Sequence, residues 1–179
     1  MITRGWLIAA ASVAGIALGA WVMTRDAPAP DQAVVGERPP DYVVRRVPQG
    51  DSTGLRVAYK NHVTLINFWA TWCGPCREEM PSIERLYTAY NARGFRVAAV
   101  SVDEGDDAAI LAYGRQIGLT FDLLHDQSGN IQQVYRTTGL PQSFLLGRDG
   151  RVAYMAMGAV EWDSPEMRQR VEQLLTQGN

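Results

Sequence analysis

Cysteine and histidine are scarce in this chain, which has two of each among its 179 residues. A zinc site that used both cysteines would need a second pair of ligands, and only His62 and His125 could provide it. An excess of one charge is also missing, because 17 Lys and Arg residues are balanced by 19 Asp and Glu residues, for a net charge of -2. This balance argues against nucleic acid or another polyanion as a partner. No flavin or nicotinamide motif is present, so we predict no cofactor and no metal beyond a redox-active pair of cysteines.

The composition, 46% hydrophobic and 20% charged, suits one globular domain with a full core and a short extra segment. That segment is a run without any charged residue, from Gly5 to Met23. As a helix it would be about 28 Å long, close to the hydrocarbon thickness of a bilayer. We therefore predict that residues 1–24 form a single transmembrane helix that anchors the chain. The alternative is a cleaved signal peptide, which Ala17 and Gly19 would suit, but the run is longer than the usual signal-peptide core of about 7 to 15 residues.

Residues 25–38 are rich in proline and alanine, which predicts a stiff, extended linker. The folded domain is predicted to span residues 36–179. Hydrophobic periodicity and turn residues predict the following elements in it. Strands are expected at 42–47, 55–59, 63–70, 95–102, 121–124, 144–146 and 152–157, and helices at 73–90, 106–116, 131–135 and 165–175.

Both cysteines belong to one Cys-x-x-Cys motif, which directly follows an apolar run. Residues 63–70 are rich in β-branched and aromatic side chains, which predicts a strand buried on both faces. A helix is predicted to begin at the cysteines, with Pro75 in its first turn, where a missing N–H is tolerated. Its buried positions should recur at helical spacing. They are Met80, Ile83, Leu86, Tyr87 and Tyr90.

The N-terminus of a helix stabilises a thiolate, because its unpaired N–H groups and the helix dipole favour negative charge. Cys73 is therefore the predicted nucleophile, and Cys76, one turn further along, is the predicted resolving thiol. Cα atoms at this spacing are roughly 5 to 6 Å apart, which a disulfide tolerates. A purely structural disulfide is the alternative, but so small a loop would stabilise the fold little. A Cys-x-x-Cys between a strand and a helix favours redox catalysis.

Glu79 is the predicted proton relay for Cys76. Three residues along a helix bring a side chain to within about 60° of the Cys76 face, whereas Glu78 points nearly the opposite way and should be solvated. If Glu79 is shielded from water, burial and a neighbouring thiolate raise its pKa and let it exchange a proton with Cys76. The alternative is a carboxylate that only favours the helix N-terminus by its charge.

The segment 68–76, Phe-Trp-Ala-Thr-Trp-Cys-Gly-Pro-Cys, resembles the active-site segment of thioredoxins. The longer run 65–81 is most similar to the TlpA/ResA-like membrane-anchored thiol-disulfide oxidoreductases of bacteria, and the likeness extends over about residues 36–175. The resemblance implies an α/β, thioredoxin-like fold. Such a fold has a central mixed β-sheet flanked by helices, here with an N-terminal hairpin and a central βα insertion.

Asn67 occupies the position where cytoplasmic thioredoxins have a buried aspartate. The family often has asparagine there, together with a glutamate that Glu79 matches. The Leu140-Pro141 segment, ahead of an apolar strand, resembles the family's cis-proline loop, which lies against the cysteine pair; a plain turn is the alternative. If Pro141 is cis, Leu140 offers backbone groups that can pair with an extended substrate. By this resemblance, the substrate-binding residues are Trp72, Gly74, Pro75, Leu140 and Pro141.

The resemblance implies an enzyme that exchanges disulfides with a protein partner. Reduction of the partner is favoured, because the Gly-Pro spacer resembles that of thioredoxin, whose couple lies near about -270 mV. Candidate targets are apocytochrome c and the cysteines of a copper-site protein, although Gln142 departs from the glutamate common in the cytochrome c maturation branch. A membrane thiol oxidoreductase would supply the electrons. The predicted location is the bacterial inner membrane, with the catalytic domain in the periplasm.

Three other functions are compatible with the same fold. A periplasmic thiol oxidase would run the exchange in the opposite direction. A peroxide-reducing enzyme would use a lone cysteine in a Thr-x-x-Cys setting, which the segment from Thr71 to Cys73 fits poorly. A copper-delivery protein would need a wider cysteine spacing and a strand-borne histidine.

Of the remaining polar and aromatic residues, His125 is predicted to be a surface or capping group, and Trp162 is predicted to serve either packing or function.

Overall fold

The computed structural model describes residues 33–177. The predicted anchor, residues 1–24, and most of the predicted linker, residues 25–38, lie outside this range. Between residues 33 and 177, no helix is both long enough and apolar enough to cross a membrane.

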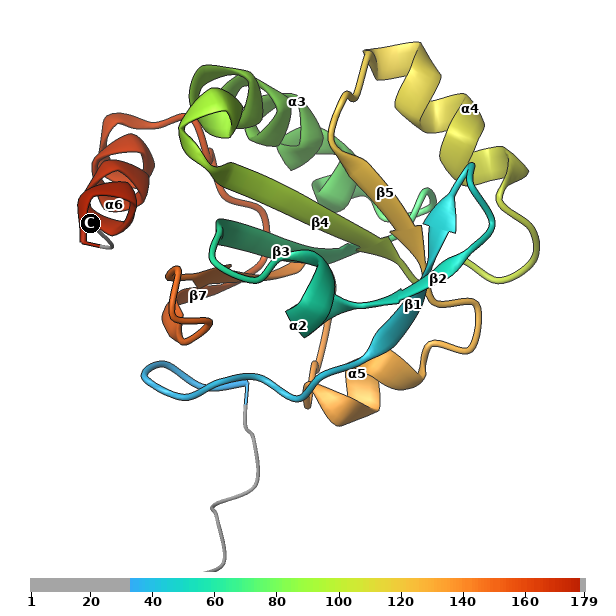
Figure 1. Cartoon of the computed structure of the whole chain (residues 1–179). Helices are drawn as coiled ribbons and strands as arrows, with labels where there is room; N and C mark the ends of the chain where they lie inside the picture. The colour runs from blue at the N-terminus through green and yellow to red at the C-terminus, as the bar shows by residue number, and fades with distance from the viewer. Residues whose placement is uncertain (1–32, 178–179) are drawn as a thin grey trace, which may run out of the picture. The chain divides into compact units, whose positions relative to one another are not determined.

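A seven-stranded mixed β-sheet forms the centre of the domain, in the order β2-β1-β5-β4-β3-β6-β7 (Figure 1). The central strands β3, β4 and β5 run parallel, and the other neighbouring pairs are antiparallel. The strands are β1 Val43–Val47, β2 Ser52–Gly54, β3 Val63–Trp69, β4 Phe95–Ser101, β5 Asp122–His125, β6 Gln142–Leu146 and β7 Val152–Met157. Every residue of β3 is buried, as the sequence predicts for a strand covered on both faces.

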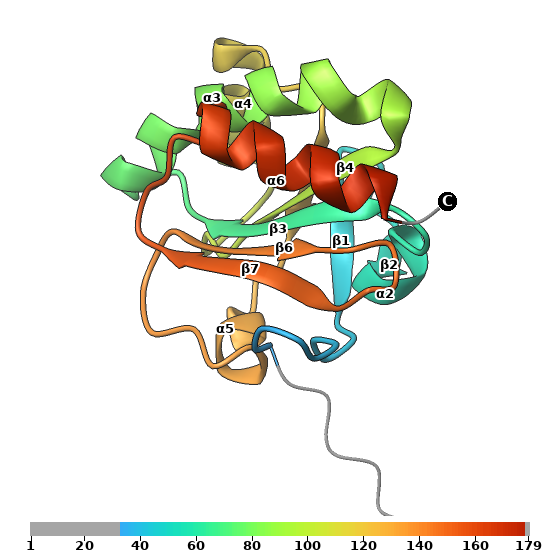
Figure 2. The same ribbon diagram turned by 90° about the vertical axis from the view of Figure 1, so that its left-hand side faces the viewer.

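Helices cover both faces of this sheet. They are α2 Leu55–Ala58, α3 Gly74–Tyr90, the 3-10 helix η1 Asn91–Arg93, α4 Ala108–Ile117, α5 Asn130–Val134 and α6 Pro165–Thr176. Figure 2 shows α3 and α6 on one side of β3, β6 and β7, and α5 on the other. Side chains of β3 alternate between these two sides. Asn67 contacts Glu79 of α3, whereas the ring of Phe68 packs against that of Tyr135, just after α5, with centroids 5.0 Å apart.

The N-terminal hairpin is present, but its second strand differs from the prediction. Residues 55–59 were expected as a strand, whereas the structure pairs Ser52–Gly54 with β1 and forms helix α2 from Leu55. The burial of the side chains explains this difference. Leu55 and Tyr59, one helical turn apart, are buried, whereas Val57 is 74% exposed. A helical turn buries two apolar side chains here, and the alternation of apolar residues that suggested a strand is coincidental.

Candidate active site

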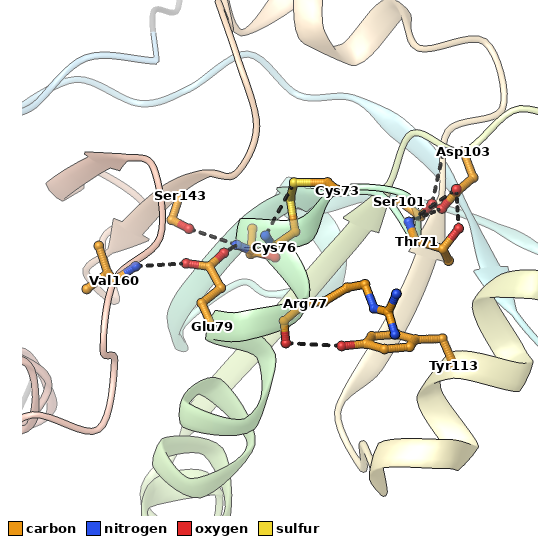
Figure 3. Close-up of a disulfide and its surroundings, with 11 residues drawn as sticks. Thr71, Cys73, Cys76, Arg77, Glu79, Ser101, Asp103, Tyr113, Ser143 and Val160 are labelled. Carbon is orange, nitrogen blue, oxygen red and sulfur yellow. Dashed lines mark hydrogen bonds between the residues drawn. A yellow bond between two sulfur atoms is a disulfide. The ribbon is translucent and has the colours of Figure 1, made fainter.

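The two cysteines form a disulfide at the start of α3 (Figure 3). Cys73 is the N-cap residue, its Cα lies 5.3 Å from that of Cys76, and its sulfur accepts a hydrogen bond from the Cys76 N–H at 3.3 Å. Cys73 retains 6% exposure, whereas Cys76 has none. An incoming thiol or disulfide can therefore reach only the Cys73 sulfur. The helix N-terminus stabilises the thiolate that Cys73 becomes on reduction.

Exposed residues surround the reachable sulfur. Trp72 is 70% exposed, and Gly74 and Pro75 are exposed in the first turn of α3. A side chain at Gly74 would meet no atom within 4 Å, so the surface above this turn is open. These three predicted substrate-binding residues therefore lie beside Cys73 and are accessible to a protein partner.

The Leu140–Pro141 peptide bond is cis, as the family resemblance implies. Pro141 is buried directly before β6, and Leu140 is partly buried. Because Gln142 pairs with Phe68 near the end of β3, the proline lies at the same sheet edge as the cysteine turn. The structure thus places the Leu140-Pro141 segment at the same end of the sheet as the turn that carries Cys73 and Cys76.

Glu79 has an ionisable side chain and lies in α3, yet it is buried, with only 2% of its surface exposed. Its Oε1 accepts a hydrogen bond from Asn67 Nδ2 at 2.7 Å, and its Oε2 accepts from the Val160 N–H at 3.1 Å and from Trp162 Nε1 at 3.3 Å. Burial raises the pKa of Glu79 to about 7, even though the three donors lower it. Glu79 is therefore poised to gain or lose a proton near neutral pH. The neighbouring Glu78 is exposed, as predicted.

Cys76 and Glu79 project from adjacent turns of α3 (Figure 3). Residues three apart on a helix share a face, with Cβ atoms about 5 to 6 Å apart. Both side chains are withdrawn from solvent. A proton of the buried thiol thus has a buried carboxylate nearby and little access to water.

Two residues of the hydrogen-bond network around Glu79 and Asn67 had no role at this site assigned from the sequence. Trp162 is fully buried and donates to the carboxylate from 83 positions away along the chain, and Ser143 accepts a hydrogen bond from Asn67 at 2.9 Å. Asn67 Oδ1 is buried without a partner among the described residues. Helical spacing singled out Glu79, and asparagine in place of aspartate at position 67 was a second sequence signal for this network. The distant contacts of Trp162 and Ser143 have no local signature.

Asp103 holds the turn that precedes Cys73. Its carboxylate accepts hydrogen bonds from the Thr71 N–H at 3.0 Å, the Thr71 hydroxyl at 2.7 Å and the Ser101 hydroxyl at 2.6 Å. His125 supports Asp103 in turn, with Nε2 2.9 Å from the Asp103 carbonyl oxygen and Nδ1 2.8 Å from Asp107 Oδ1. The prediction of a surface position for His125 is wrong. Its side chain is 1% exposed, because the carboxyl end of β5 brings it under the loop after β4.

No group of three or more His, Cys, Asp or Glu side chains between residues 33 and 177 is arranged to hold a metal ion. The cysteine pair suits dithiol–disulfide exchange, because Cys73 is reachable, Cys76 is shielded, and a buried carboxyl group can carry a proton.

Residues 35–155 match the AhpC/TSA family. Curated relatives include the thiol-disulfide oxidoreductase ResA of Oceanobacillus iheyensis, 30% identical over 134 residues that cover 74% of this chain and 69% of the relative. ResA of Geobacillus kaustophilus is 32% identical over 126 residues, which cover 70% of this chain and 71% of the relative. A solved structure of a putative thiol:disulfide interchange protein DsbE from Chlorobium tepidum aligns with a TM-score of 0.71 and 29% identity, covering 79% of this chain and 98% of that one. The thioredoxin-like α/β fold with its mixed central sheet is thereby confirmed.

Proposed function

Since the chain belongs to the AhpC/TSA family and is a thiol:disulfide oxidoreductase of the DsbE/ResA type, we propose that it reduces disulfides of a protein partner through Cys73 and Cys76. One observation supports this proposal most strongly: Cys73 caps α3 and is the one residue of the pair that keeps any exposed surface. A protein disulfide presented over Trp72 and the first turn of α3 would meet this sulfur first.

In the proposed reaction, the Cys73 thiolate attacks one sulfur of the partner disulfide and releases the other as a thiolate. A mixed disulfide then joins Cys73 to the partner. Glu79, as a carboxylate, takes the proton of Cys76, and the resulting thiolate attacks the Cys73 sulfur. The partner leaves as a dithiol after it gains two electrons, and it receives protons from Glu79 and from solvent. The enzyme is left with the Cys73–Cys76 disulfide.

The role of Glu79 follows from burial at both ends of this proton transfer. Cys76 has no exposed surface, so water cannot readily accept its proton. A group that serves as both base and acid works best when its pKa lies near the ambient pH, and the pKa of Glu79 is raised to about 7. We assign Glu79 as the base for Cys76 during reduction and, once Glu79 has taken up another proton, as the acid that protonates Cys76 when the enzyme is re-reduced.

The location, substrate and electron donor are also part of the proposal. Residues 1–24 would anchor the chain in the bacterial inner membrane, with residues 36–179 in the periplasm. The substrate would be apocytochrome c or a copper-site protein during assembly of respiratory complexes, and a membrane thiol oxidoreductase would reduce the enzyme again. The oxidising environment of the periplasm makes a dedicated reductant necessary there.

Trapping with single-cysteine variants tests the proposal. We expect Cys76→Ser to accumulate a mixed disulfide with the natural partner, which mass spectrometry of the adduct would name. Cys73→Ser should form no adduct and should lose reduction of a model protein disulfide, because the remaining sulfur is shielded. Adducts that form equally well with both variants would refute the assignment of roles. The reduction potential tests the direction, since a value near about -270 mV fits a reductant and one near about -120 mV would indicate an oxidase.

A further inference from the structure

A cavity of about 590 Å³ lies on the side of the sheet away from α3. Thr64 and Ile66 of β3 line it, and these side chains alternate with Asn67, which contacts Glu79 of α3. Helix α2 and the turn between β6 and β7 form other walls. The lining residues Thr64 and Ile66 lie in the amino-terminal half of β3, whereas the cysteines follow its carboxyl end. It is therefore separate from the exchange site.

The lining of this cavity is strongly basic. Four of its lining residues are Arg or Lys and one is Asp, although acidic residues outnumber basic ones in the chain as a whole. The carboxylate of Asp149, the single acid, interacts with Arg151. Its Oδ1 accepts a hydrogen bond from the Arg151 N–H at 3.0 Å, and its Oδ2 lies 3.7 Å from Arg151 Nε. Arg151 does not line the cavity. Asp149 thus does little to offset the positive charge of the other lining residues.

Three of the four cations lack an ionic partner in the part of the chain that the structure describes. Arg38, Lys60 and Arg148 form no salt bridge there, and Arg38 donates from Nε only to the carbonyl oxygen of Asp149, at 3.0 Å. The Nη2 of Arg148 donates to the carbonyl oxygens of Arg93 at 3.3 Å and of Leu175 at 3.5 Å. Arg38 and Lys60 are therefore the cations of the lining that an anionic group in the cavity would pair with.

Much of the remaining lining is apolar, although Asn61, His62 and Thr64 also belong to it. Its apolar part includes Leu55, Ile66, Leu146 and Tyr135, each at most 9% exposed. The volume falls within the range of about 300 to 1,000 Å³ that is typical of small-molecule sites. Apolar walls with a few cationic groups suit a ligand that has an apolar body and an anionic head.

We propose that this cavity binds an amphiphilic anion, in which a carboxylate or phosphate is joined to an apolar body. Arg38 and Lys60 hold the head by charge, and the apolar body packs against Ile66 and Leu146. Two sources of such a molecule are a single-chain lipid and a compact aromatic acid. The site is independent of the exchange reaction, because none of its lining residues belongs to the cysteine turn or to the Glu79 network.

Calorimetric titration of the full chain with three probes tests this site. Laurate represents the lipid source, 2-naphthoate the compact acid, and dodecanol provides the same chain as laurate without the charge. We expect saturable one-to-one binding of laurate or 2-naphthoate, and the tighter of the two identifies the source. The Arg38→Ala/Lys60→Ala double variant should weaken that binding at least tenfold. Arg115→Ala removes an exposed cation of α4 outside the cavity and should leave the affinity within twofold.

Three results would overturn the proposal. They are the absence of saturable binding of either acid, equal affinity for laurate and dodecanol, and equal affinity in the double variant and the wild type. Disulfide reduction by the double variant should stay within twofold of the wild type. This activity also shows that the variant is folded, so a loss of binding cannot be attributed to unfolding.

Discussion

The buried carboxyl group of Glu79 makes the stability of the oxidised protein depend on pH. Burial raises its pKa from the ordinary value of 4.5 to about 7. Below about pH 4.5 the group is protonated in both the folded and unfolded chains and contributes no pH dependence. Between these two values the folded chain keeps the proton that the unfolded chain loses. Stability therefore falls as the pH rises through this range, and the full penalty is present above pH 7.

The size of this penalty follows from the same two values. Each tenfold change in the acid dissociation constant, which is one pKa unit, corresponds to about 1.4 kcal/mol. Ionised Glu79 should therefore lower the free energy of unfolding by roughly 3 kcal/mol. Glu79→Gln removes the ionisation. Its amide NH2 would face Asn67, whose Oδ1 is buried without a partner among residues 33–177 and could accept this hydrogen bond after the Asn67 amide turns over. The variant should therefore keep the network.

Guanidinium denaturation of the oxidised protein between pH 4.5 and 8 measures this effect. The stability of Glu79→Gln minus that of the wild type should rise by roughly 3 kcal/mol across the range. Glu78→Gln, which changes the exposed neighbour on the same helix, is the matched control and should show a flat difference. A flat difference for Glu79→Gln as well would refute the raised pKa and, with it, the proton relay.

Other predictions concern the surroundings of the cysteine pair and the fold. Trp162→Phe deletes one of the donors that lower the pKa of Glu79, so the midpoint of the pH–rate profile of disulfide reduction should move to higher pH; an unchanged midpoint would mean that this hydrogen bond is negligible. Asp103→Asn weakens the anchor of the turn before the first cysteine and should lower the free energy of unfolding by about 1 to 3 kcal/mol in urea titrations. Leu55→Ala should cost about 2 to 5 kcal/mol and Val57→Ala about 0.5 kcal/mol or less, whereas similar costs for the two variants would favour a strand over helix α2.

Local sequence predicted the elements that carry the chemistry. The apolar run before the motif, the proline in the first helical turn and the helical spacing after it placed Cys73 at the start of α3. The same helical geometry separated buried Glu79 from solvated Glu78. These predictions succeeded because each depends on residues within one turn or one strand. The cis-proline segment was anticipated only through the family resemblance.

Features that arise from distant contacts could not be predicted in the same way. The partners of Glu79 at positions 160 and 162 reach it only because the loop before α6 passes over α3. The burial of His125 depends on strand order, which places β5 beside β4. The apolar alternation at 55–59 fitted a strand as well as a helical turn, and packing decided the outcome. The basic cavity gathers residues from four separate segments, none of which has an unusual composition.

The difference in exposure between the two sulfurs constrains the kinetics of the whole cycle. An electron donor that regenerates the dithiol must also attack at Cys73, since no part of Cys76 is accessible from outside. Donor and substrate therefore compete for a single docking surface and cannot be bound together. Double-reciprocal plots of turnover should accordingly be parallel lines, the ping-pong pattern, and a large excess of either protein should inhibit the other half-reaction.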